Sequence, residues 1–268
     1  MSIVAQRRMT AFMESPDAPR PGNPIHSTDG AKAYGYEGAL VGGATVYGWA
    51  VRTIVQALGE SWLDEGWAEV RFRRPVYPGD ELDISVADDG TLNIAKGDQV
   101  CIGGEVGLGE ANWLGDLAMP TRLTPEPRGE KLPALTMGNA PVGHDLKARA
   151  APTPVDEVIA FARQKEGESL QCFLSQRPRL HPGWIASQLT HLLHHSYDYG
   201  PAIHAASRMQ HLRPAYAGQT LTVAGHCVEA YERKGHHYIV NDGAILGEQG
   251  EILVRLRHTA IFEVAKRG

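Results

Sequence analysis

Apolar side chains recur at helical spacing between residues 44 and 58. They stand three and four positions apart, at Val46, Trp49, Ala50, Thr53, Ile54 and Ala57. A helix with 3.6 residues per turn gathers such positions on one side, so the spacing predicts a helix with one buried face. Gly59 follows this stretch and is suited to end the helix.

Strict alternation of apolar and polar residues appears next. Leu82, Ile84 and Val86 alternate with polar neighbours, which predicts a half-buried strand, and Asp88-Asp89-Gly90 predicts a hairpin turn after it. Near the C-terminus the pattern predicts three successive antiparallel strands. They cover residues 221–231, 236–246 and 251–264, with turns around Lys234-Gly235 and residues 248–250.

The chain contains an internal repeat. Residues 74–84 match residues 213–223, with Arg, Pro, Tyr, Gly and Leu identical at a constant offset of 139. Upstream, Leu40-Val41-Gly42-Gly43 corresponds to Leu180-His181-Pro182-Gly183 at an offset of 140, and a second helix is predicted over 184–197 with Gly200 as its stop. We infer a duplicated unit in which a long helix precedes an antiparallel sheet, so the predicted fold class is α+β.

Prolines mark the boundary between the two copies. Seven of the 17 prolines fall between residues 120 and 154, where neither helical nor strand periodicity is evident. Such a stretch is typical of a linker or an extended crossover. We therefore predict an N-terminal unit over 1–118, a Pro-rich linker over 119–154 and a C-terminal unit over 155–268.

Composition narrows the class of protein. With 43% hydrophobic and 21% charged residues, the 268-residue chain is ordinary for a packed globule. A formal net charge of −5 argues against nucleic-acid binding, which requires a basic excess. No apolar run is long enough to span a membrane and the first ten residues lack the apolar core of a signal peptide, so we expect a cytoplasmic protein.

No metal centre is expected from the sequence. Cys101, Cys172 and Cys227 are far apart and match no zinc spacing or disulfide framework. His191, His194 and His195 have helical spacing, but no carboxylate or cysteine stands at a suitable distance to complete a metal site. We predict a polar interface or a ligand-facing surface for them instead.

At this point the residues resemble a known family. A duplicated helix-and-sheet unit resembles the double hotdog fold, and Asn23-Pro24-Ile25-His26, followed by Gly35 and Gly43, resembles the MaoC-like (R)-specific enoyl-CoA hydratases and dehydratases. The resemblance covers roughly residues 20–110 well and 180–264 more loosely. It implies two fused hotdog units, of which the first carries the catalytic loop and the second shapes the substrate pocket.

The resemblance also implies roles for individual residues. His26 and Asn23 match the family's catalytic loop, with His26 as the acid/base and Asn23 as an orienting group. The family's catalytic Asp falls on Pro21, which has no carboxyl group, so Glu14, Asp17 or Asp29 would have to serve if a second acid is needed. For Asp29 we favour a place in the first turn of a short helix that begins at Thr28.

Substrate binding suggests further candidates. Backbone N–H groups of Gly42 and Gly43, at the start of the first helix, would hold the thioester oxygen. Arg74 and Arg213 are candidate contacts for CoA phosphates, and His181, at the start of the second helix, is a candidate ligand contact. We expect no bound cofactor, because the substrate itself would carry CoA or a phosphopantetheine arm.

The sequence therefore predicts an acyl-thioester hydro-lyase. It would hydrate an enoyl-CoA-type substrate or dehydrate a 3-hydroxyacyl thioester. Two alternatives remain: a hotdog thioesterase, or a non-catalytic acyl-CoA-binding or partner subunit, because Pro21 stands where the Asp is expected. The expected partner is a small acyl thioester and not a nucleic acid or a membrane, and a homodimer is possible.

Overall fold

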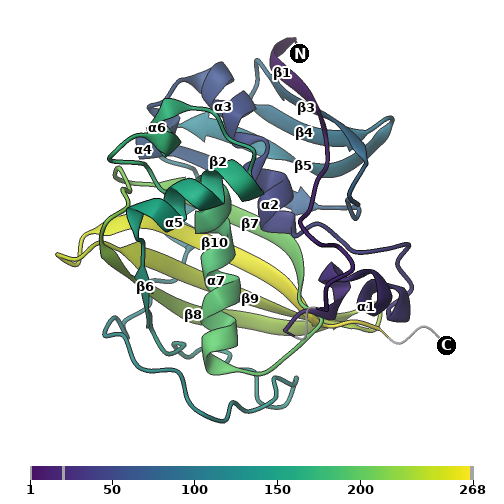
Figure 1. The fold of residues 1–268 in the computed structure, drawn as a ribbon. Coiled ribbons are helices and arrows are strands. Elements are labelled where there is room, and N and C mark those ends of the chain that lie inside the picture. The colour runs from purple at the N-terminus through teal and green to yellow at the C-terminus, as the bar shows by residue number, and fades with distance from the viewer. Residues whose placement is uncertain (1, 20–21, 266–268) are drawn as a thin grey trace.

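Ten antiparallel strands form one continuous sheet that curves around two central helices (Figure 1). The computed structural model describes residues 2–19 and 22–265. The order across the sheet is β1-β3-β4-β5-β2-β7-β10-β9-β8-β6. The strands are β1 (Ile3–Thr10), β2 (Gly66–Phe72), β3 (Glu81–Ala87), β4 (Thr91–Lys96), β5 (Gln99–Leu108), β6 (Arg149–Pro152), β7 (Ile203–His211), β8 (Thr220–Arg233), β9 (His236–Leu246) and β10 (Ile252–Glu263).

Alternation along the strands explains which face packs against the helices. In β3, Leu82 and Ile84 are buried in the core while Glu81 and Asp83 are exposed, as the period of two requires. The three C-terminal strands predicted from the sequence are confirmed as β8, β9 and β10, which are neighbours in the sheet. The predicted α+β class is confirmed as well.

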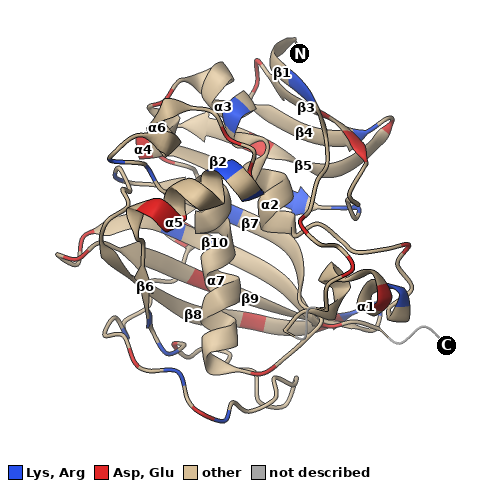
Figure 2. Cartoon of the chain, viewed as in Figure 1, with Lys and Arg blue, Asp and Glu red and all other residues tan. Residues whose placement is uncertain are grey.

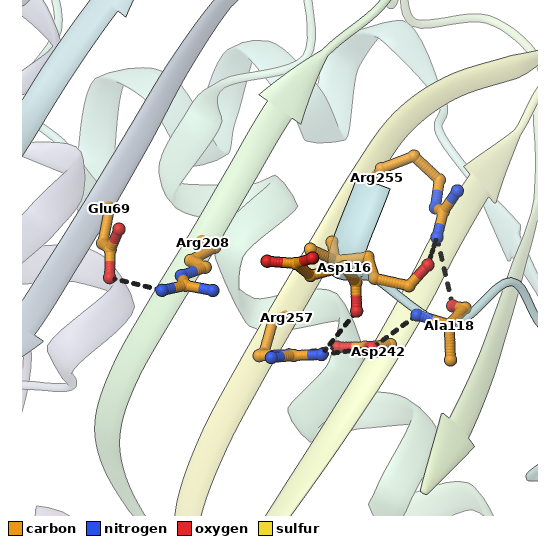
Figure 3. Close-up of polar contacts among 8 residues, drawn as sticks. Glu69, Asp116, Ala118, Arg208, Asp242, Arg255 and Arg257 are labelled. Atoms are coloured by element: carbon orange, nitrogen blue, oxygen red, sulfur yellow. Dashed lines mark hydrogen bonds and ion pairs between the residues drawn. The ribbon is translucent and has the colours of Figure 1, made fainter. Parts of the chain in front are cut away.

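The two halves of the sheet join at its centre. Strands β2 and β7 pair antiparallel, with Glu69 opposite Arg208. The side chains of these two residues form an ion pair at 3.1 Å on the face away from the helices (Figure 3). Because 208 and 69 differ by the repeat offset of 139, this pair lies where equivalent positions of the two copies meet.

Each half contributes a central helix. The predicted helix at 44–58 is two helices in the structure, α2 (Gly43–Gly48) and α3 (Val51–Leu58). A turn at Trp49 and Ala50 separates them, and within it the Ala50 N–H donates a hydrogen bond to the Tyr47 carbonyl. The turn directly follows Gly48, and glycine is a weak helix former. Gly59 ends α3 with a positive φ of 84°, as predicted.

The second central helix is α7 (Pro182–Ser196). It begins two residues earlier than predicted because Pro182 is suited to the first helical turn and His181 caps it. It ends at Ser196, with Tyr197 as the C-cap, so Gly200 is not its stop. Shorter helices surround the pair: α1 (Thr28–Ala33), α4 (Trp62–Glu65), α5 (Val155–Ala160) and α6 (Gln171–Leu174).

A close helix crossing holds α2 against α7. A Cβ added to Gly183 would lie 3.1 Å from Gly48 Cα and 3.2 Å from the Ala44 carbonyl oxygen, so only glycine allows this approach. The carboxyl group of Glu166 is buried beside both glycines. Among the described residues it has no hydrogen-bond partner, and burial raises its pKa well above the usual range.

The crossover between the halves runs over the far face of the sheet. Asp242, which is fully buried, accepts hydrogen bonds from the Arg257 guanidinium at 2.5 and 2.7 Å and from the Ala118 N–H at 2.7 Å (Figure 3). Arg255 donates to the carbonyl groups of Leu117 and Ala118 at 2.7 and 3.1 Å. These charge-assisted bonds fix the start of the crossover to β9 and β10.

The Pro-rich segment is not wholly without secondary structure. Residues 149–152, within the predicted linker, form the edge strand β6, which pairs with β8. The sequence gives no strand periodicity there, because backbone pairing with β8 needs no side-chain periodicity in so short a segment. The boundaries at residues 118 and 154 stay a prediction. No helix in the described part of the chain is both long and apolar enough to cross a membrane.

Candidate functional site

Two cavities meet at His26. The first has a volume of about 640 Å³ and lies between the two halves, and the second, of about 580 Å³, lies beside the N-terminal loop. Both are lined by Asn23, His26, Gly42, Thr45, Phe161 and Lys165. A substrate that occupies both cavities would therefore pass His26 at their junction.

The tautomer of His26 follows from two hydrogen bonds. Its Nδ1 lies 2.8 Å from the Leu40 carbonyl oxygen, which can only accept, so Nδ1 carries the proton. Its Nε2 lies 3.1 Å from the amide nitrogen of Asn23 and accepts from it. The structure thus holds a neutral imidazole whose basic nitrogen is Nε2.

Asn23 connects the loop of His26 to the second half of the molecule. Its Oδ1 accepts from the Ala202 N–H at 3.1 Å, and its Nδ2 donates to the Ala202 carbonyl at 2.8 Å as well as to His26. Both amide hydrogens are therefore used. The structure favours Asn23 as the group that orients His26 and not as a direct substrate contact.

Local sequence explains the shape of this loop. Asn23 has extended backbone angles, as expected of a residue before proline, and Pro24 starts the single 3₁₀ turn Pro24–His26. Buried Ile25 accepts a backbone bond from Leu40 N–H, and the Ser27 hydroxyl donates to the Pro24 carbonyl at 2.9 Å. These contacts place the imidazole toward the cavities.

The start of α2 forms the cavity wall next to His26. A Cβ on Gly42 would lie 3.7 Å from His26 Cε1. A Cβ on Gly43 would lie 2.9 Å from the Phe72 ring and 3.0 Å from His204 Cβ, so a side chain at 43 would displace its neighbours. Gly42 thus lies beside His26, and Gly43 lines the same cavity.

Comparison with solved structures identifies the architecture. A structure described as a candidate MaoC domain dehydratase from Chloroflexus aurantiacus J-10-fl aligns with a TM-score of 0.63 and 16% identity, covering 100% of this chain and 95% of that one. A conserved protein from Mycobacterium tuberculosis, reported to have a double hotdog fold, aligns with a TM-score of 0.62 and 14% identity over 95% and 93%. This chain has a double hotdog fold.

A solved structure with another described activity is also similar. A structure described as a candidate thioesterase from Novosphingobium aromaticivorans aligns with a TM-score of 0.51 and 14% identity, covering 98% of this chain and 99% of that one. No family model matches the chain, and a search of curated proteins finds no match.

The candidate acids differ in where the double hotdog places them. Glu14 lines the second cavity together with His26. Asp29 lies in the first turn of α1, as predicted, and neither Asp29 nor Asp17 lines a cavity near His26. Pro21 lies outside the described residues.

The two predicted arginines have different surroundings. Arg74 is exposed at the mouth of the first cavity. Arg213, its counterpart in the repeat, is exposed but lines neither cavity that contains His26. The backbone N–H of each bonds to the adjacent strand at 3.3 Å, Arg74 to Cys101 and Arg213 to Leu253, so the repeat preserves the sheet and not the site.

His181 is a core residue and not part of the cavity wall. Only 1% exposed, it accepts the Gly183 N–H at Nδ1 at 3.1 Å and packs its ring 4.7 Å from that of Phe173. Burial lowers its pKa, against the opposing effect of Glu168 3.9 Å away. The expectation of a ligand contact is corrected: the residue before Pro182 caps α7.

His204 and His258, which belong to no short sequence motif, line the other wall of the first cavity. His258 Nε2 lies 3.1 Å from Thr190 Oγ1, and its Nδ1 lies 3.0 Å from Nε2 of His204, which is 2.6 Å from Ser207 Oγ. Desolvation lowers the pKa of His258 to about 4 and that of His204 well below its usual range, so both are neutral near pH 7. The inward alternation of Leu256, His258 and Ala260 in β10 was the available signal.

This wall carries hydrogen-bonding capacity without charge. No Lys, Arg, Asp or Glu occurs along α7, which Figure 2 shows entirely in tan. Of the three histidines on its surface, His191 lines the cavity, His194 stacks on Tyr199, and His195 lies 2.9 Å from the Glu126 carbonyl. Within the described residues, no group of three or more His, Cys, Asp or Glu could hold a metal ion.

Proposed function

We propose that this double hotdog protein is a MaoC-like hydro-lyase that acts on acyl thioesters. It would hydrate an enoyl-CoA-type substrate or dehydrate the corresponding 3-hydroxyacyl thioester. The observation that carries the proposal is His26, held as a neutral imidazole at the junction of two cavities and beside the start of α2.

Hydration requires three actions that these groups can perform. Nε2 of His26 accepts a proton from water as the water oxygen bonds to the β-carbon, and the electrons of the double bond move to the thioester oxygen. Backbone N–H groups at Gly42 and Gly43 stabilise the resulting enolate. The proton then passes from Nε2 to the α-carbon, which adds one water to the substrate and restores the neutral imidazole.

Asn23 has a positioning role in this scheme. The hydrogen bond from its side-chain amide to Nε2 of His26 must be replaced by one from the water. Its two hydrogen bonds to the Ala202 backbone keep the side chain in place.

The direct test follows the enone absorbance of crotonyl-CoA and of longer enoyl-CoAs. We expect turnover by the unaltered protein and a loss of roughly 10²- to 10⁴-fold in His26→Ala. His144→Ala changes an exposed histidine in the crossover and serves as the matched control. No turnover of any enoyl thioester by the unaltered protein would overturn the proposal.

Thioester hydrolysis is the second candidate function. Glu14, on the wall of the second cavity with His26, offers a carboxylate where Pro21 cannot, and the likeness to a candidate thioesterase points the same way. Hydrolysis would release a free thiol from saturated acyl-CoA, which a thiol reagent detects. Binding of acyl-CoA without turnover, unchanged in His26→Ala, would instead favour a non-catalytic binding subunit.

A further inference from the structure

A third cavity lies outside the site described above. It is an open groove of about 790 Å³ over β2, β7, β8, β9 and β10. In β2, Ala68 and Val70 face the core, so Glu69 and Arg71 point to the opposite face, away from the helices. Figure 3 shows Arg208 and Arg257 on that same face of the sheet.

The groove concentrates positive charge. Five arginines (Arg71, Arg73, Arg208, Arg233 and Arg257) line it, against the two glutamates Glu69 and Glu229. Arg208 is paired with Glu69, and Arg257 with Asp242. In the described part of the chain, Arg71, Arg73 and Arg233 have no ion-pair partner. A basic surface of this kind, on a chain whose formal charge is −5, attracts an anionic ligand.

This arginine groove adjoins the first cavity. Phe72, Arg73, Ala205 and Tyr238 line both, at the ends of β2, β7 and β9. Arg74 adjoins them at the cavity mouth. A molecule with one end beside His26 can therefore leave the cavity around these strand ends and continue into the groove.

The groove also offers an aromatic surface. The rings of Tyr231 and Tyr238 stack at 4.9 Å with an interplanar angle of 4°, and both residues line the groove. Arginine side chains bind phosphate through paired N–H donors, and flat rings stack on nucleobases. The combination suits a phosphorylated nucleotide, and the groove volume falls within the range of small-molecule sites.

We propose that the arginine groove binds the phosphorylated nucleotide end of CoA, which makes CoA, and not a carrier protein, the carrier of the acyl group. The proposal rests on the proposed function only in placing the thioester beside His26. Arg71, Arg73 and Arg233 contact the diphosphate and the 3′-phosphate, and the tyrosine pair receives the adenine. The pantetheine arm then spans the shared cavity mouth.

The test compares CoA with pantetheine, which lacks the nucleotide, by titration calorimetry at low and high salt. We expect CoA to bind more tightly than pantetheine, and salt to weaken only CoA binding. In Arg71→Glu/Arg233→Glu, the Kd for CoA should rise about tenfold or more while the Kd for pantetheine stays unchanged. The exposed pair Lys131→Glu/Lys147→Glu changes the net charge equally, lies outside the groove and the cavities, and should leave both Kd values unchanged.

Two results would overturn the inference. One is equal affinity for CoA and pantetheine, unaffected by Arg71→Glu/Arg233→Glu in a protein whose circular dichroism is unchanged. The other is that Arg71→Glu/Arg233→Glu weakens the turnover of an enoyl group on a carrier protein but leaves the turnover of enoyl-CoA unchanged. Failure of the proposed function gives a different pattern, in which CoA binding depends on the groove but no enoyl thioester reacts.

Discussion

The segments that precede the two central helices are equivalent in the repeat, but one borders two cavities and the other fills the core. Before α2, the loop of Asn23 and His26 leaves two cavities open beside an imidazole. Before α7, the corresponding segment folds as α5, a π-helical turn at Phe161–Lys165 and α6, and it buries Phe173, Glu166 and His181. One copy of the unit therefore has a candidate site before its central helix, while buried side chains fill the equivalent position of the other copy.

The strand that follows each helix shows the same divergence. Phe72 lies at the end of β2 on the cavity wall, and its counterpart at the offset of 139 is His211. His211 is 1% exposed and packs 5.2 Å from the Trp62 ring, and burial lowers its pKa to about 4. Duplication thus preserves backbone geometry, whereas single side chains decide whether a cavity exists.

The largest expected effect separates His26 from His181, the two histidines that precede the helices. His26→Ala should reduce turnover by roughly 10²- to 10⁴-fold with little change in the free energy of unfolding, because His26 lies at a cavity. His181→Ala should lower that free energy by about 1–2 kcal/mol, through loss of a buried cap, and keep turnover. Enoyl-CoA kinetics and urea unfolding check both; equal loss of activity in the two variants would contradict the comparison.

A second contrast concerns Gly43 and Gly183, equivalent glycines at the helix starts. Gly183→Ala puts a Cβ 3.1 Å from Gly48 Cα and 2.8 Å from the Glu166 carboxyl. We therefore expect a loss of about 1–3 kcal/mol in unfolding free energy. Gly43→Ala meets the Phe72 ring and His204 Cβ at the cavity wall and not the backbone of a packed helix, so it should mainly reduce kcat. Chemical unfolding and steady-state kinetics measure the two effects, and a larger stability loss in Gly43→Ala would refute the assignment.

The pH dependence of stability tests the buried segment before α7, which contains Glu166 and Glu168. Because burial raises the pKa of Glu166, the folded state holds the proton of this carboxyl more tightly than the unfolded chain does. The free energy of unfolding therefore falls as the pH rises above 4.5, the ordinary pKa of a glutamate. Glu166→Gln removes that cost and should raise the unfolding free energy at pH 7 by on the order of 1–3 kcal/mol, and by less at pH 5.

Glu168 should show the opposite pH dependence when the free energy of unfolding is measured by urea titration. Burial raises its pKa, but the His181 ring 3.9 Å away and hydrogen bonds from the N–H groups of Ser169 and Leu170 outweigh this effect and lower it. Its contribution is therefore present above the unfolded pKa and is lost as pH falls. Glu168→Gln should destabilise the protein at pH 7, and urea titrations at several pH values would reveal any deviation from these opposite signs.

The smallest expected effect compares Arg74 with Arg213. Arg74→Ala should raise the KM for enoyl-CoA by a few-fold with kcat unchanged, since an exposed arginine at the cavity mouth contributes modestly to phosphate binding. Arg213→Ala should change neither constant, because Arg213 lines neither cavity at His26. An increase in KM in both variants would mean that the second half also faces the substrate.

Local patterns in the sequence were sufficient for much of this molecule. The spacing of Val46, Trp49 and Ile54 and the alternation of Leu82, Ile84 and Val86 are properties of single elements, so these elements could be predicted, although the first helix is divided in the structure. The repeat between residues 74–84 and 213–223 revealed the duplication. Asn23 and His26 were found because they are three residues apart in one loop.

Tertiary structure alone decided the rest. His204 and His258 are 54 positions apart, yet they bond to each other, and the arginine groove joins residues of five strands from both halves. His181 was a candidate ligand contact from the sequence, and only the packing of Phe173 against its ring places it in the core. Periodicity depends on neighbours a few residues away, whereas burial, cavities and clusters of charge depend on which distant segments meet, and only the folded chain specifies that.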